Sequence, residues 1–133
     1  MVYKYVLLKD SFGIVIFLDI DEVEDPEIAE SDVLVSSNIY LRIGENIHLQ
    51  KHILVEWIGK GIRDMAGGIH MKVNNRRVCL YLKKIDFDDA HFQDEGLYCA
   101  VQAWISKYYD LPASSVRIEL DKNRQKFIFH ITD

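Results

Sequence analysis

Apolar and polar positions alternate at the start of the chain and predict a β-hairpin. Tyr3, Tyr5 and Leu7 occupy alternate positions, the period at which side chains of a strand share one face. Residues 10–13 supply turn-forming Asp, Ser and Gly, and residues 14–18 read as the return strand. Because residues 14–18 are apolar throughout, we expect a central strand that is covered on both faces.

Further segments show the same two-residue period. Residues 39–43 alternate in this way and end at Gly44, which predicts another strand. Residues 69–73 and 78–82 flank Asn74-Asn75 and predict a second hairpin. Residues 115–121 and 126–131 predict a third hairpin.

Two segments instead show helical spacing. Residues 52–66 predict a helix that Gly67-Gly68 closes, and Gly59 and Gly61 each weaken it by about 1 kcal/mol relative to Ala. A second helix begins near Asp94, and its apolar stripe is formed by Leu97, Val101, Trp104, Ile105 and Tyr108. Together the elements predict an α+β fold, in which an antiparallel or mixed sheet built from hairpins carries two amphipathic helices.

Length and composition predict one domain, residues 1–133, in the cytoplasm. The chain has 133 residues and no Gly/Ser-rich linker. Its start resembles no signal peptide, and it has no apolar run of about 18 residues that would span a membrane. Cys79 and Cys99 lie among apolar neighbours, so buried, reduced thiols are expected, although a disulfide stays open at this stage.

Negative charge is concentrated in one segment of the chain, and this segment is the main indication of function. Residues 19–32 carry eight carboxylates and no Lys or Arg. Residues 1–32 have a net charge of −7, whereas residues 33–133 have +2. Pro26 inside the run argues against a regular strand and favours a loop, or a short helix that starts near Glu27. Such a segment attracts a basic surface or cations and repels nucleic acid.

The residues that could carry chemistry form no catalytic motif. The acidic run can be laid on a calcium loop, but Val23 and Glu24 fall where a ligand and a glycine are needed. His48 and His52 are four residues apart without a third metal ligand nearby. His91 follows Asp86, Asp88 and Asp89, which leaves a small metal-dependent enzyme as one alternative. We therefore predict neither a cofactor nor a bound metal, and no enzymatic activity.

A small, acidic α+β chain with clustered carboxylates resembles bacterial immunity proteins of the toxin–antitoxin or contact-dependent inhibition kind. The resemblance implies a cytosolic protein that binds a cognate toxin domain and neutralises it. Many such toxins are nucleases with positive substrate grooves, which an acidic surface can occupy. An adaptor or regulatory interaction protein would have the same sequence features and stays as the alternative.

The predicted partner surface consists of exposed carboxylates that contact a basic protein. Burying so many like charges would be prohibitive, so we expect them in solvent. The two acidic segments are expected to meet in space. The predicted contact residues are Asp19, Asp21, Glu22, Glu24, Asp25, Glu27, Glu30, Asp32, Asp86, Asp88 and Asp89.

Overall fold

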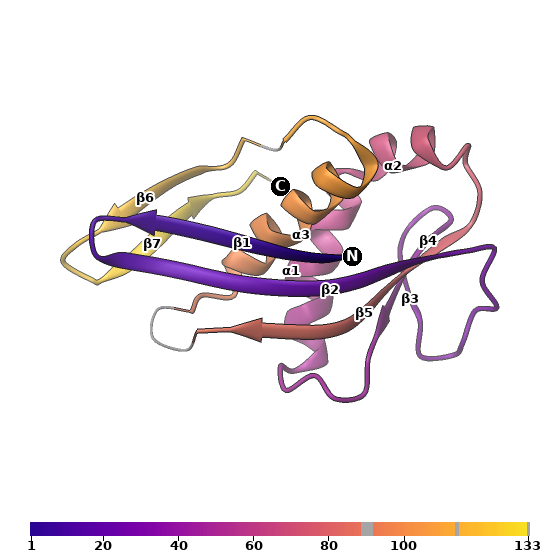
Figure 1. Cartoon of the computed structure of the whole chain (residues 1–133), viewed down its shortest axis with the longest axis horizontal. Helices are drawn as coiled ribbons and strands as arrows, with labels where there is room; N and C mark the ends of the chain where they lie inside the picture. Colours follow the sequence, from indigo (N-terminus) through magenta and orange to yellow (C-terminus); the bar gives the residue numbers. More distant parts are fainter. Residues whose placement is uncertain (89–91, 114, 133) are drawn as a thin grey trace.

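The computed structural model describes residues 1–88, 92–113 and 115–132 (Figure 1). In these ranges the chain forms seven strands and three helices. In chain order they are β1 (Val2–Lys9), β2 (Phe12–Glu24), β3 (Val33–Ser36), β4 (Ile39–Ile43), α1 (Lys51–Asp64), α2 (Ala66–Lys72), β5 (Val78–Phe87), α3 (Glu95–Tyr109), β6 (Arg117–Asp121) and β7 (Lys126–His130).

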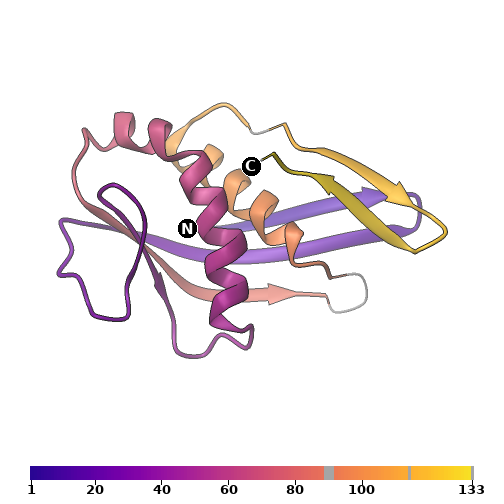
Figure 2. The ribbon, with the colours of Figure 1, turned by 180° about the vertical axis from the view of Figure 1, so that it is seen from behind.

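A five-stranded mixed sheet organises the molecule, with strand order β1-β2-β5-β4-β3. Only the β4–β5 pair is parallel, and α1 and α2 form the crossover between these two strands. Strands β6 and β7 form a separate two-stranded sheet. The helices lie on one side of the five-stranded sheet, as Figure 2 shows from behind. The predicted α+β class, the β1–β2 and β6–β7 hairpins, and the helices that became α1 and α3 are confirmed.

The core lies between the sheet and the helices. Ile14, Ile16 and Leu18 of β2 are buried on that side, and Trp104 of α3 has no exposed surface. The indole Nε1 of Trp104 also donates to the Met1 carbonyl at 2.8 Å. Gly61 lets α1 approach α3, because a Cβ at this position would lie 2.4 Å from Val101 Cγ1. A glycine that weakens the isolated helix therefore permits the helix–helix contact.

The predicted second hairpin is wrong in its first half. Residues 69–72 belong to α2, where Ile69 and Val73 pack into the core four residues apart. A short run with Ile, Met and Val at alternate positions fits the helical period as well as the strand period. Asn74 and Asn75, both with positive φ, still reverse the chain before β5. Strand β5 pairs instead with β2 and β4.

The prediction that the acidic run is a loop is wrong for residues 19–24 and right around Pro26, and the prediction of a strand covered on both faces is wrong. Strand β2 continues through the carboxylates as far as Glu24, and Pro26 lies beyond its end. The chain leaves the strand at Asp25, which has φ 46°. The helices cover only one face of β2, and Phe17 on the opposite face is exposed.

Two further observations concern the expected location and the thiols. No helix in the described ranges is both long enough and apolar enough to cross a membrane. Cys79 and Cys99 are buried and free, as expected for structural thiols.

Candidate functional site

The face of the sheet that the helices leave uncovered presents exposed apolar side chains. Val2, Val6 and Leu8 of β1 are 62%, 50% and 68% exposed, and the neighbouring Phe17 of β2 is 37% exposed. The register pairs Lys4 with Phe17, so alternate residues of both strands share this face. We call these four apolar residues the apolar patch. Apolar patches with polar borders are typical of protein contact surfaces.

Asp19 and Asp21 continue β2 beyond the apolar patch, but cations already neutralise them. Lys83 Nζ of β5 lies 3.7 Å from the Asp19 carboxylate and 2.9 Å from that of Asp21. The Met1 amine lies 4.0 Å and 3.5 Å from the same two carboxylates. The hydrogen bond from Lys83 is the main reason that the pKa of Asp21 is lowered. These charges give a partner little net field.

Glu22 points to the other side of β2. The Tyr109 hydroxyl at the end of α3 donates a hydrogen bond to its carboxylate. Burial, followed by this contact with Glu22, raises the pKa of Tyr109 well above its ordinary value. Glu22 therefore connects the sheet to α3, and it is not the free contact residue that the sequence predicted.

Asp32 contradicts the expectation of exposure most clearly, because its side chain has no solvent-accessible surface. Arg42 of β4 donates from Nε to Oδ1 at 2.9 Å and from Nη2 to Oδ2 at 2.8 Å. The Ala29 amide also donates to Oδ2 at 2.8 Å. The bonds from Arg42 are the main reason that the pKa of Asp32 is lowered. We call this arrangement the Asp32–Arg42 clamp.

The clamp also holds the chain that precedes it. Arg42 Nη2 donates to the Glu27 carbonyl at 3.0 Å, and Lys51 Nζ reaches the Ser31 carbonyl at 3.4 Å. The Asp25 amide donates to the Arg77 carbonyl at 3.0 Å. Residues 24–30, which we call the acidic loop, are therefore attached to β4 and to the turn before β5, and Ser31, which follows the loop, is attached to α1.

The acidic loop carries the charge that remains after these pairings. Its four carboxylates are exposed, and within the described ranges none forms an ion pair; they belong to Glu24, Asp25, Glu27 and Glu30. The exposed Arg76 and Arg77 lie at the same end of the sheet, because Val78 pairs with Glu24. The unpaired negative charge of the run is confined to residues 24–30, and these two arginines lie near it.

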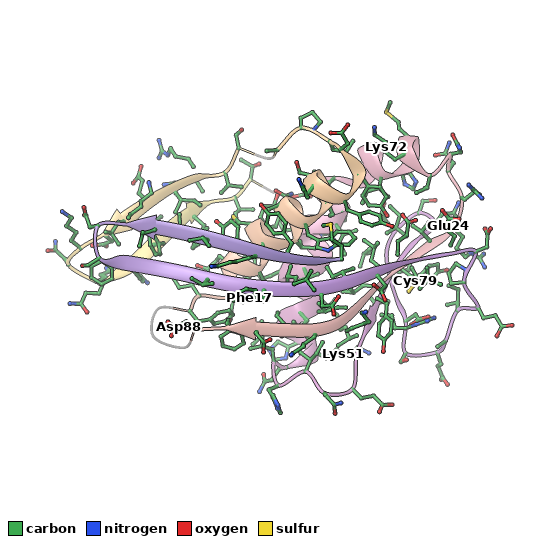
Figure 3. All side chains as sticks on the ribbon, in the orientation of Figure 1. Phe17, Glu24, Lys51, Lys72, Cys79 and Asp88 are labelled. Carbon is green, nitrogen blue, oxygen red and sulfur yellow. The ribbon has the colours of Figure 1, made fainter. Side chains whose placement is uncertain are left out.

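The second acidic segment does not join this loop. Asp86 pairs across the sheet with Phe17, and Lys84 Nζ lies 3.5 Å from its carboxylate. Glu24 lies seven positions beyond Phe17 on β2, a distance of about 23 Å along a strand. Glu24 and Asp88 lie at opposite ends of the β2–β5 pair (Figure 3). Asp89 and His91 lie outside the described residues, so the expected contact involving Asp89 and the alternative base His91 stay predictions.

The other candidate chemistry gains no support. Extended strand geometry through Glu24 is incompatible with the calcium loop considered from sequence. In the part of the chain that the structure describes, no three His, Cys, Asp or Glu side chains are placed to hold a metal ion. Burial raises the pKa of the Cys79 thiol to about 11, and that of Cys99 also to about 11. Thiols of this kind are poor nucleophiles at neutral pH.

Sequence reasoning missed the apolar patch and the clamp for different reasons. The patch left a signal, because Val6 and Leu8 are apolar at positions that alternate with the core-facing Tyr5 and Leu7. The clamp left none, since a lone Asp and a lone Arg ten residues apart are common on any surface. No family model, curated protein or solved structure matches the chain.

Proposed function

We propose that this chain is a cytosolic immunity protein that binds and neutralises a basic toxin domain through the acidic loop. The observation that carries the proposal is the set of four exposed carboxylates, unpaired among the described residues, on a loop that hydrogen bonds at Asp25 and Glu27 hold in place. An anchored loop loses less conformational entropy on binding than a free one. The carboxylates of the acidic loop can therefore attract a partner without the loop first having to become ordered.

The expected mechanism is steric and electrostatic occlusion. The positive substrate groove of a nuclease would attract the carboxylates of Glu24, Glu27 and Glu30, and opposite fields of this kind mainly accelerate association. The apolar patch on the same side of the sheet as Asp19 and Asp21 would add buried area to a larger contact. Long-lived inhibition needs such area, because exposed charges contribute little to slow dissociation.

The experiment compares two variants with equal charge. The test variant carries Glu24→Gln, Glu27→Gln and Glu30→Gln. The control carries Glu56→Gln, Asp110→Asn and Glu119→Gln, which neutralise three exposed carboxylates elsewhere. Each protein is used to capture partners from the native cytosol at low salt, and captured proteins are identified by mass spectrometry.

The wild type and the control should capture a basic protein that the test variant captures poorly. This result would support the acidic loop as the contact surface. The same protein must then arrest growth when expressed alone, and co-expression of this chain must restore growth. A captured partner that is not toxic would favour the adaptor alternative. Equal association rates for the test variant and the control would show that the acidic loop serves only solubility.

A further inference from the structure

The free edge of β1 points its main-chain hydrogen-bonding groups away from the sheet. The Met1 carbonyl accepts a hydrogen bond from the Ile20 amide at 3.1 Å, so the main-chain N–H and C=O groups of the odd-numbered residues of β1 point toward β2. Main-chain groups alternate in direction along an antiparallel strand, and those of Lys4, Val6 and Leu8 therefore face outward. Within the described ranges these outward groups have no hydrogen-bond partner.

This edge has one of the usual protections against pairing, the charged side chains of Lys4 and Lys9, but neither a proline nor a bulge. It is eight residues long, contains no proline and keeps one register with β2 throughout. Natural edge strands of this length are normally interrupted by proline, a bulge or inward charges. The nearby hairpin does not pair with it, and the contact at its end is Lys9 Nζ donating to the Ile118 carbonyl at 2.7 Å.

Two hollows lie beside this edge, each lined by one of two alternate residues of β1. The first, of about 110 Å³, is lined by Tyr5, Cys99, Val116 and Ile118. The second, of about 330 Å³, lies next to Tyr3 and is more polar. Ala103 and Ala113 line both, so the hollows adjoin. Tyr3 and Tyr5 are two residues apart, about 7 Å along a strand, which matches side chains i and i+2 of an added strand.

Charge around the edge is opposite to that of the molecule. The ammonium groups of Lys4, Lys9 and Lys107 have no carboxylate partner in the described part of the chain, and Asp110 is the carboxylate that lines the second hollow. This surplus of positive charge occurs in a chain with net charge −5. Carboxylates on an added strand would complement it.

We propose that β1 binds an extended segment of another protein by strand addition. The segment places two apolar side chains into the hollows and carries acidic residues on either side of them. Main-chain hydrogen bonds to Lys4, Val6 and Leu8 supply affinity, and the hollows supply specificity. This inference concerns a different edge and an acidic partner, so it stands independently of the acidic loop.

The probe is the peptide Glu-Thr-Val-Thr-Val-Thr-Glu, acetylated and amidated, which reads the same in both chain directions. Binding is followed by amide chemical shifts and hydrogen exchange in NMR. In the free protein, the amides of Tyr5 and Leu7 should exchange slowly, and those of Val6 and Leu8 rapidly. Addition of the peptide should slow exchange at Lys4, Val6 and Leu8.

Two variants test the edge in different ways. Val6→Pro removes an outward N–H, a change that an edge strand tolerates, and Val6→Thr is its control. Ala103→Leu projects a larger side chain from α3 into the space where the two hollows adjoin, and it leaves the sequence of β1 unchanged. We expect Val6→Pro and Ala103→Leu each to weaken binding at least about tenfold, while Val6→Thr binds as wild type.

Absence of any shift or protection at about 1 mM peptide would overturn the inference. Unchanged binding by the Ala103→Leu variant would also overturn it, even if Val6→Pro failed to fold. Sedimentation gives the remaining outcome. A dimer of this chain that Val6→Pro abolishes would show that the edge binds a second copy, and would refute a different partner.

Discussion

Breaking the Asp32–Arg42 clamp should lower the free energy of unfolding by more than breaking a surface ion pair would. Arg42→Met removes two hydrogen bonds to the Asp32 carboxylate and one to the Glu27 carbonyl. It leaves the Asp32 carboxylate, which has no exposed side-chain surface, with the Ala29 amide. A buried charge that loses its partner costs about 3–5 kcal/mol. Because Arg42 itself is partly exposed, water can enter, and we expect about 2–3 kcal/mol.

A double-mutant cycle measures the pair itself. Asp32→Asn, Arg42→Met and the double variant are unfolded in urea beside the wild type. The double variant should lose clearly less than the sum of the two single losses, because each single substitution already breaks the pair and leaves one partner stranded, whereas the double variant leaves none. Single losses below about 0.5 kcal/mol that simply add would refute the reasoning, since exposed pairs behave in that way.

The pH dependence supplies an independent check on the same pair. The clamp lowers the pKa of Asp32 below its ordinary value of 3.8, so the folded state favours the charged carboxylate. The stability it contributes is therefore fully present above pH 3.8 and is lost as pH falls through the lowered folded pKa. The Arg42→Met variant should lose less stability than the wild type over this acid range.

Three further predictions concern the core. Trp104→Ala should cost about 3–5 kcal/mol in urea melts, and a loss below about 1 kcal/mol would contradict the observed burial. Gly61→Ala should destabilise the protein by about 1–3 kcal/mol, because the new Cβ would meet Val101. Gly67→Ala should stabilise it by about 0.5–1 kcal/mol, because a Cβ there has open space. Similar effects of the two substitutions on the free energy of unfolding would disprove the Gly61–Val101 contact. Cys79 and Cys99 should react with a thiol reagent at pH 8 only upon unfolding, and rapid labelling of the native protein would contradict their raised pKa values.

Elements with strong local patterns could be predicted from the sequence. The predicted stripe of α3 is buried from Leu97 to Ile105, although Tyr108 at its end is exposed and Tyr109 is buried instead. The first hairpin combines alternation with turn residues. Helix α2 could not be predicted, because seven residues with two glycines give too little helical signal. Strand order was equally hidden, since β4 and β5 pair across an intervening crossover of two helices.

The candidate site was predicted less well, because pairing partners distant in sequence decide which charges remain. Lys83 lies about sixty residues beyond Asp19 and Asp21, and it allows these two aspartates, a residue type of low strand propensity, to continue β2. Nothing in residues 19–32 reveals that partner. The carboxylate of Asp32 is likewise buried only because Arg42 comes from the neighbouring strand β4.

The two-residue period of β2 therefore determines which part of the acidic run a partner can recognise. It turns Asp19 and Asp21 toward Lys83 and Glu22 toward Tyr109, so these charges hold the fold together. Within the described structure, carboxylates remain without a counter-charge only at the last residue of the strand, Glu24, and beyond it, where the chain turns at Asp25. Eight acidic residues in sequence thus become four on one anchored loop. A partner that recognises this charge must approach the end of the sheet, and the apolar patch lies within reach only if the contact extends along β2.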